Sequence, residues 1–308
     1  MRGRLLLVAL SIVGSSVASG CADFTVNLAV NSTAAALQRG ARSLDMERDV
    51  RLVRDALPGT IKTLDSFHVA GPDNEIITEL VVKARAQYAF AFLEADLEAM
   101  GATDTPERKA LVARTTAMYL SAYDEAMAWL GRYDRELPAI VAADLAAIEQ
   151  RLQTVDKKGA AKPLYWAGLA LGSAVDLNRD DVDKVADLPK AALLLKRSRD
   201  LDPAYENHGA ALALGVLYGS QTKTMGGDPE RAKQYFQEVD AATGNRFLMS
   251  PVLFARSVCV VTQDRELYEK TLNAVLAAPP TIWPEQRLAN EIARLRAERY
   301  LARADELF

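Results

Sequence analysis

The stretch that decides the fold runs from Pro189 to Pro203 and reads PKAALLLKRSRDLDP. Ala191, Leu195 and Ser198 stand at relative positions 0, 4 and 7, and Pro203 follows at position 12. Steps of four and three residues place side chains on one face of a helix, and a proline cannot continue the helix. The stretch therefore predicts a short amphipathic helix with a small or apolar buried face and a chain break directly after it.

The same spacing recurs along the chain. The other copies are Tyr268, Leu272, Val275 and Pro280; Ala232, Phe236 and Val239, with Gly244 in place of the proline; and a weaker copy, Thr60, Leu64, Phe67 and Pro72. Two copies follow a helix with a matching pattern, which contains Leu214, Gly215 and Tyr218 in one case and Trp166 and Leu169 in the other. Such helix pairs are typical of degenerate tetratricopeptide repeats. The alternative is an all-α bundle whose apolar residues match the spacing by chance.

Composition also favours helix. Of the 308 residues 50% are hydrophobic and 25% charged, but only 7% are aromatic, and alternating runs of Val, Ile and Thr are rare. We expect helices over residues 24–40, 45–57, 60–70, 75–100, 106–135, 138–154, 162–176, 186–200, 204–222, 229–242, 249–262, 265–277 and 284–305. The predicted fold class is all-α, with antiparallel helix pairs stacked as degenerate tetratricopeptide-like repeats in a single domain over residues 21–308.

A glycine-rich turn with the sequence TMGGDPERAKQYFQ occupies residues 224–237 and has the look of a phosphate-binding loop. Asp228 is, however, well placed to cap the following helix, and Pro229 removes a backbone donor that an anion would need. No Lys-Ser or Lys-Thr pair follows, so the Walker pattern is absent. The turn instead ends an insertion between two repeat helices. We expect this insertion, Ser220–Gly227, and a second one, Asn178–Lys184, to project as loops from one face.

The N-terminus has the features of a secretory signal. Two arginines precede the apolar run Leu5–Val13, and small residues then lead to Cys21. Residues 18–21, Ala-Ser-Gly-Cys, resemble a bacterial lipobox, which predicts a signal peptide over residues 1–20 and lipidation of Cys21. The alternative is an uncleaved signal anchor over Leu5–Ala22.

Charge and cysteine usage limit the classes of partner and of chemistry. Without the two N-terminal arginines, 35 of the 37 basic residues remain against 41 acidic ones, so the mature chain is mildly acidic and has no basic cluster for nucleic acid. Cys259 is the one cysteine besides Cys21, and it lies in an apolar run. We therefore expect a buried thiol and no intramolecular disulfide.

The sequence contains few groups suited to catalysis. His68 and His208 are the two histidines, and a packing or capping role is favoured over a catalytic one for each, although a hydrolase with His208 as its base remains an alternative. The acidic run Asp180–Asp183 lacks the glycine and terminal glutamate of an EF-hand, which favours a solvated loop over a calcium site. We expect no enzyme activity, no metal and no cofactor.

Four aromatic residues are candidates for a ligand or partner surface, because they lie on or beside repeat helices, where solenoids form concave faces. They are Tyr165, Trp166, Tyr205 and Tyr218. The alternative is that they fill the space between helices, as aromatic residues in these repeats mostly do.

Several short motifs share their order and spacing with one family. They are Cys21, the turn Gly71-Pro72-Asp73-Asn74, Pro163-Leu164-Tyr165-Trp166, Asp187-Leu188-Pro189-Lys190-Ala191, Leu201-Asp202-Pro203-Ala204-Tyr205, Met225-Gly226-Gly227-Asp228-Pro229-Glu230, Asn290 and Asp305-Glu306-Leu307-Phe308. Together they resemble the T-component family of TRAP (tripartite ATP-independent periplasmic) transporters, the TatT-like lipoproteins, over residues 21–308. Ala18 in the lipobox and His208 depart from the family pattern.

The resemblance implies a periplasm-facing lipoprotein that associates with the solute-binding protein of a TRAP transporter. It also implies oligomerisation and a channel for a hydrophobic or organic-acid ligand, while Ala22 after the lipidated cysteine implies the outer membrane. The alternative function is a general outer-membrane scaffold of the tetratricopeptide type that serves envelope assembly.

Overall fold

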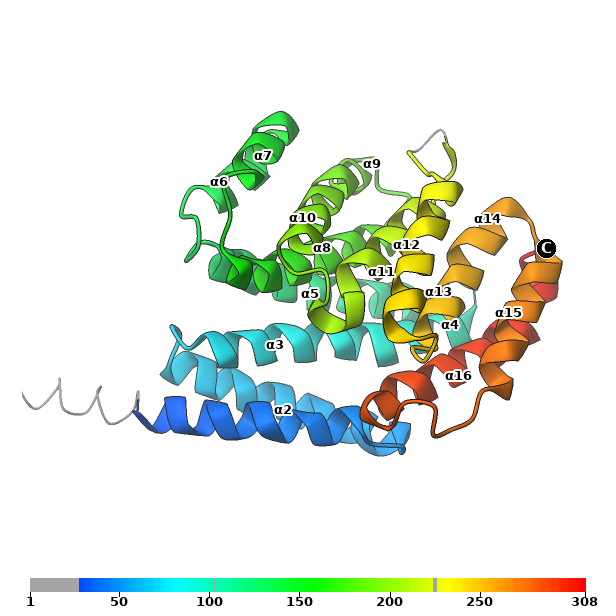
Figure 1. Cartoon of the computed structure of the whole chain (residues 1–308), viewed down its shortest axis with the longest axis horizontal. Coiled ribbons are helices and arrows are strands. Elements are labelled where there is room, and N and C mark those ends of the chain that lie inside the picture. The colour runs from blue at the N-terminus through cyan, green and yellow to red at the C-terminus, as the bar shows by residue number, and fades with distance from the viewer. Residues whose placement is uncertain (1–27, 102, 224–225) are drawn as a thin grey trace, which may run out of the picture.

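The computed structural model describes residues 28–101, 103–223 and 226–308. Within these ranges the chain forms helices and turns and no strand, so the predicted all-α class is confirmed. The helices pack against one another in consecutive layers and surround the middle of the molecule (Figure 1).

The N-terminal part is built from long helices with capped ends. Residues 28–45 are helical, and α2 (Val50–Ala70), α3 (Glu75–Tyr88), the π-helix η1 (Ala89–Leu93) and α4 (Glu94–Met100) follow. Asp49 caps α2 by accepting from the Leu52 amide at 3.0 Å, and Asn74 caps α3 by accepting from Ile77 at 2.9 Å.

One predicted break in this part is wrong. We expected separate helices over residues 45–57 and 60–70, because Pro58 and Gly59 stand between them, but α2 continues through both residues. Leu57, Ile61 and Leu64 form one buried stripe in the N-terminal core. Burying this stripe outweighs the cost of an interior proline, which is about 3 kcal/mol.

The central part contains the first stacked pairs. Its helices are α5 (Pro106–Leu130), α6 (Leu137–Ala143), α7 (Leu145–Leu152), η2 (Lys158–Ala160), α8 (Ala161–Asp176), α9 (Val182–Val185) and α10 (Leu188–Leu201). Helix α8 packs between α5 and α10. The helix expected over residues 138–154 is divided at Asp144, whose carboxylate accepts from the Ala146 amide at 3.1 Å and starts α7.

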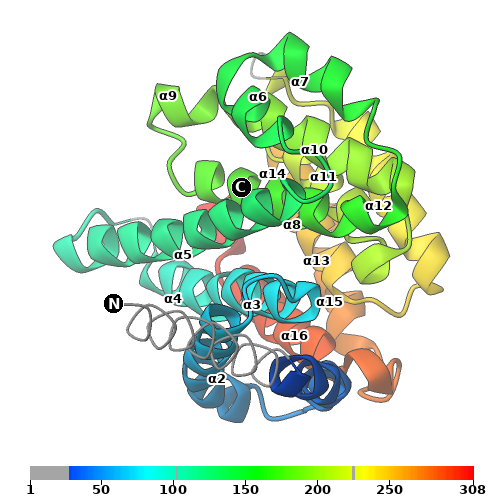
Figure 2. The same cartoon turned by 90° about the vertical axis from the view of Figure 1, so that its left-hand side faces the viewer.

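The C-terminal part continues the stack and returns to the beginning of the chain. Its helices are α11 (Tyr205–Gly219), α12 (Pro229–Thr243), α13 (Met249–Phe254), the π-helix η4 (Ala255–Cys259), α14 (Val260–Thr262), α15 (Arg265–Ala277), η5 (Pro284–Gln286), α16 (Arg287–Ala302) and η6 (Ala304–Glu306). Helix α11 packs on α12, and α15 packs on α16. Both views show α16 near α2, and Arg299 of α16 is paired with Glu98 of α4, so the last long helix closes the stack against the first ones (Figures 1 and 2).

The residues at the predicted repeat positions are buried. All nine in the three good copies are at most 2% exposed: Ala191, Leu195, Ser198, Ala232, Phe236, Val239, Tyr268, Leu272 and Val275. In the weaker copy Leu64 is buried, and Thr60 and Phe67 are half-buried. The spacing therefore identified core positions, and the assignment to tetratricopeptide repeats remains a prediction.

The glycine-rich turn is a helix start, as predicted. Asp228 accepts from the Arg231 amide at 3.0 Å, and Pro229 is the first residue of α12. A Cβ on Gly227 would lie 2.0 Å from the Gln221 carbonyl oxygen, so this position requires glycine. The other insertion contains the short helix α9, and Arg179 in it donates to the Ser220 carbonyl at 2.8 Å. The described residues of the two insertions lie on the same edge of the molecule (Figure 1).

In the described part of the chain no helix is long and apolar enough to cross a bilayer. The predicted signal peptide over residues 1–20 and the lipidation site Cys21 lie outside the described residues.

Candidate functional site: a central cavity

A cavity of about 990 Å³ lies within the ring of helices. Its wall includes residues of α2, α3, η1 and α4 from the N-terminal part, of α5, α8, α9, α10 and α11 from the stack, and of α13, η4, α14 and α16 from the C-terminal part. A volume of this size is at the upper end of the range for small-molecule pockets. The cavity is thus bounded both by the first helices and by α16, the last long one.

Three irregular stretches of helix line this cavity. The two π-helices, η1 and η4, contribute Phe90 and Arg256 to its wall. At the start of α11, Glu206, Asn207 and His208 have φ of 50°, 55° and 63°, and the first two line the cavity. Non-glycine residues rarely adopt this left-handed conformation. Both π-bulges and such strained turns are concentrated at functional sites.

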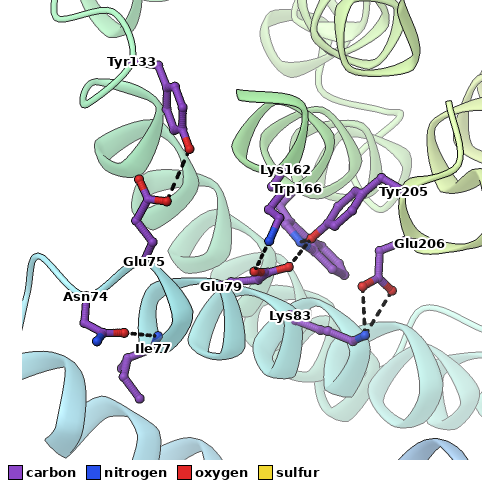
Figure 3. Close-up of polar contacts among 10 residues, drawn as sticks. All are labelled: Asn74, Glu75, Ile77, Glu79, Lys83, Tyr133, Lys162, Trp166, Tyr205 and Glu206. Atoms are coloured by element: carbon purple, nitrogen blue, oxygen red, sulfur yellow. Dashed lines mark hydrogen bonds and ion pairs between the residues drawn. The ribbon is translucent and has the colours of Figure 1, made fainter. Parts of the chain in front are cut away.

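The start of α11 is held by a network that reaches α3 (Figure 3). Trp166 Nε1 donates to the Tyr205 hydroxyl at 2.8 Å, and the hydroxyl donates to Glu79 Oε1 at 2.8 Å. The other oxygen of Glu79 accepts from Lys162 Nζ at 2.7 Å. Burial, with the negative charges of Glu206 and Glu79 nearby, raises the pKa of Tyr205 far above its usual value, so this hydroxyl stays protonated as a donor.

An ion pair fixes the left-handed turn itself. Lys83 Nζ on α3 donates to both carboxylate oxygens of Glu206, at 2.8 and 3.1 Å (Figure 3). Asp45, near the same lysine, also lines the cavity, and burial raises its pKa. Because the turn is bonded to α3 from two successive residues, Tyr205 and Glu206, its strain is offset by contacts across the cavity wall.

A second polar cluster, which we call the basic end, joins α4 to α16. It consists of the cavity-lining residues Arg256, Arg296, Arg299 and Arg303 and the cavity-lining carboxyl groups of Glu94, Glu98 and Glu306. Arg296 is 2% exposed, lies 3.3 Å from Glu94 Oε2 and donates to the Phe90 carbonyl at 2.6 Å. Burial raises the pKa of Glu94 to about 7, although Arg296 and the hydrogen bond from the Tyr119 hydroxyl both oppose this rise.

Two comparisons with known proteins bear on what such a chamber does. The family model described as TRAP transporter T-component matches residues 46–308. The chain therefore belongs to the TRAP transporter T-component family. A protein of Treponema pallidum (strain Nichols), described as an uncharacterized protein, is 22% identical over 265 residues, which is 85% of this chain and 81% of the relative. Family membership gives the chain an accessory role in a TRAP transport system.

The four predicted surface aromatics of this T-component fall into two groups. Tyr165 and Trp166 line the cavity, and Tyr205 is bonded to Trp166 and packs edge-on against Tyr165. Tyr218 does not line the cavity: it stacks on Tyr235 at 6.1 Å between ring centroids. The structure thus brings three of the four together. That any of them contacts a ligand or partner remains a prediction.

The residues of the basic end were missed in the sequence. Arg256 stands alone in the apolar run around Cys259, and a single arginine in such a run was the available signal. Glu94 and Arg296 are 202 residues apart, and no spacing pattern connects them. Cys259 is fully buried, as expected, and burial raises the pKa of its thiol to about 12.

Of the candidate catalytic and metal-binding residues of the T-component, His68 and Asp181 have structural partners. His68 Nε2 lies 3.0 Å from a Glu125 oxygen, and Asp181 caps α9 by accepting from the Lys184 amide at 3.3 Å. Among the described residues His208 has no hydrogen bond to a serine or cysteine, and its Nδ1 is buried without a partner. Within the same ranges no group of three or more His, Cys, Asp or Glu side chains is placed to hold a metal ion.

Proposed function

We propose that this T-component is a lipid-anchored, periplasm-facing accessory protein that docks a TRAP-type solute-binding protein and holds a hydrophobic or organic-acid ligand in the central cavity. The observation that carries the ligand part is the 990 Å³ cavity, whose wall combines apolar helix faces with the three irregular stretches. The role requires binding and release and no covalent chemistry.

The proposed docking face is the edge with the two insertions. Arg179 of one insertion and Ser220 of the other are hydrogen bonded to each other, and both line the cavity. A partner that covers this edge would lie directly over an end of the chamber. This arrangement supports transfer of a ligand between the two proteins, because no long diffusion path through water separates them.

Capture from a periplasmic extract tests the docking part. The chain that starts at Ala22 is cross-linked lightly in the extract of the source organism, and the captured proteins are identified by mass spectrometry. We expect a TRAP-type solute-binding protein as the main product. A variant with Arg179→Glu reverses the charge at the proposed face. In this variant the recovery of the solute-binding protein should be lower. Envelope-assembly proteins as the main product would support the general scaffold instead, and the absence of any solute-binding protein would refute the proposal.

The anchor and the oligomer are tested on the full-length chain. Mass spectrometry of the membrane-bound protein should find a diacylglycerol-modified Cys21 at the N-terminus, and Cys21→Ser should release the chain from the outer-membrane fraction. An unmodified chain that keeps residues 1–20 would indicate the signal anchor. Light scattering of the soluble chain should give a multiple of the monomer mass, because we also propose a homo-oligomer.

A further inference from the structure

A pair of stacked tyrosines lies at the surface where α11 packs on α12. The rings of Tyr218 and Tyr235 have their centroids 6.1 Å apart and their planes at 11° to each other. Both side chains are half-buried: one side packs against the central core, and neither lines the central cavity. The pair therefore presents part of its surface to solvent.

Three cations lie over these two rings. The Arg231 guanidinium of α12 is 4.5 Å from the ring centroid of Tyr218 and 5.9 Å from that of Tyr235. From α10, Lys196 Nζ is 5.8 Å from the Tyr218 centroid. The Arg199 guanidinium, also of α10, is 5.6 Å from the Tyr235 centroid. A cation within about 6 Å of a ring centroid is attracted to the ring face, and we call these five residues the tyrosine platform.

The platform has more positive than negative charge. Arg199 donates to both carboxylate oxygens of Glu238, at distances between 2.7 and 3.1 Å. Among the described residues neither Lys196 nor Arg231 has a side-chain hydrogen bond or an ion pair. Two of the three cations are thus uncompensated, on a chain in which 41 acidic residues outnumber 37 basic ones.

The exposed carboxylates of the same helices do not neutralise these two cations. Asp200 at the end of α10 lies 4.0 Å from Arg197, and Glu230 at the start of α12 lies 3.7 Å from Lys233. Each of them is therefore beside a cation that is not part of the platform.

The rings keep the cations ready for an anion. An arginine stacked on an aromatic face has the N–H groups in the plane of its guanidinium free, and these match the two oxygens of a carboxylate. Packing on a ring also restricts long side chains before binding, which lowers the entropy lost when they are paired. Because the cations are distributed over two rings and two helices, they suit several carboxylates in a row better than one small anion.

The platform adjoins the proposed docking edge. The Asp228 amide donates to the Tyr218 carbonyl at 2.9 Å, and Asp228 directly follows the insertion Ser220–Gly227 and caps α12. Figure 1 shows α12 well away from the end of the molecule at which the described chain begins. This placement favours a protein partner over a membrane surface.

We propose that the tyrosine platform is a docking surface for an acidic segment of a protein partner, whose carboxylates pair with Lys196 and Arg231. This inference rests on the proposed docking function and adds the surface and the chemistry that hold the partner. Tyr218 and Tyr235 act as positioning residues, because they contact the cations rather than the partner's carboxylates.

Fluorescence anisotropy of a labelled oligoglutamate peptide tests the surface on the chain that starts at Ala22, which retains every described residue. The unaltered protein should bind the peptide, and more weakly as salt is added, because salt screens exposed charges. In the double variant Lys196→Gln/Arg231→Gln the affinity should fall about tenfold. Tyr235→Leu keeps all three cations but removes one ring, so it should weaken binding by a smaller factor, whereas Tyr235→Phe should leave it unchanged.

The matched control is Arg114→Gln/Lys270→Gln. It removes the same charge from two exposed residues of α5 and α15 that, in the described part of the chain, lie over no aromatic ring. Its affinity should change by less than about twofold, and thermal melts should show that all variants are folded. The inference is overturned if the unaltered protein does not bind the peptide, if the platform variant binds it as before, or if the control loses as much. Tighter binding to phosphatidylglycerol vesicles through the same two cations also overturns it, in favour of a membrane contact.

The capture experiment separates this inference from the proposed function. If the platform variant captures the solute-binding protein as well as the unaltered chain does, the inference fails and the proposed function stands. If peptide binding depends on the platform but no solute-binding protein is captured, the acidic-segment surface stands and the proposed partner is refuted.

Discussion

Two glycines of α8 should respond to alanine with opposite signs, and the reason is their place in the stack. A Cβ on Gly168 would lie 2.7 Å from Leu195 Cγ and 3.0 Å from the Ala191 carbonyl oxygen on α10, both at the predicted repeat positions. A Cβ on Gly172, one turn later, would meet only the Ala191 Cβ at 3.7 Å, an ordinary contact. Gly168 is therefore the point of closest approach between the two helices.

The magnitudes follow from these distances. Alanine in place of glycine in a helix interior is worth about 1 kcal/mol of added stability. At Gly168 the methyl group overlaps a backbone oxygen that cannot rotate away, and such overpacking costs about 1–3 kcal/mol. We expect Gly168→Ala to lower the free energy of unfolding by about 1–2 kcal/mol and Gly172→Ala to raise it by about 0.5–1 kcal/mol.

Urea denaturation of the chain that starts at Ala22, followed by circular dichroism, measures both changes. The two variants should have the same dependence on urea concentration, so that the shift of the midpoint reports stability alone. If Gly168→Ala is as stable as the unaltered protein, or if both variants are destabilised equally, α8 and α10 are not in close contact at this point and the reasoning is wrong.

Three further predictions concern single side chains. Burial raises the pKa of Glu94 from its usual 4.5 to about 7, so the folded state keeps a proton that the unfolded state loses. Stability should therefore fall by up to about 3 kcal/mol as the pH rises from about 4.5 to 7, and in Glu94→Gln this part of the pH dependence of urea midpoints should be absent. Tyr205→Phe removes the acceptor of the buried Trp166 Nε1 and should cost about 1–3 kcal/mol in the same urea assay, with a changed tryptophan emission; an unchanged midpoint would contradict the hydrogen bond. Cys259, fully buried and with a thiol pKa of about 12, should react with a chromogenic disulfide reagent only as fast as the protein opens, whereas rapid reaction in the native state would contradict its burial.

Sequence patterns predicted the parts of this fold that local chemistry determines. The spacing of Ala191, Leu195 and Ser198 reports which face of a helix is buried, and this depends only on the period of the helix. Asp228 and Pro229 identified a helix start because capping involves residues three positions apart.

The cavity could not be predicted in the same way, because it depends on contacts between distant segments. Its basic end requires Glu94 and Arg296 to meet across the chain. Nothing local marks the left-handed turn at Glu206, since the turn is held by Lys83 on another helix. The false break at Pro58 has the same origin: the packing of the stripe around Leu57 overrides a local helix breaker.

The contact between Arg296 and Glu94 joins α16 to α4 and closes the ring of helices. The energy of this ion pair can be separated from that of the apolar stack of Arg296 on Phe90. The Arg296 guanidinium lies 4.0 Å from the Phe90 ring centroid and is almost fully buried. In Arg296→Met the apolar stack on Phe90 is retained, but the buried carboxyl group of Glu94 loses its counter-charge, and breaking a buried pair in this way costs about 3–5 kcal/mol.

Protonation limits this cost. The pKa of Glu94 rises further when Arg296 is absent, so the loss in Arg296→Met should be largest above pH 8 and small at pH 5, where the carboxyl group is neutral with or without its partner. Adding Glu94→Gln to Arg296→Met should restore stability at high pH, because no buried charge is then left without a partner. A double-mutant cycle in urea at the two pH values measures this coupling. If the coupling energy is the same at pH 5 and pH 8, the two side chains do not interact as an ion pair, and the closure of the ring depends on apolar packing alone.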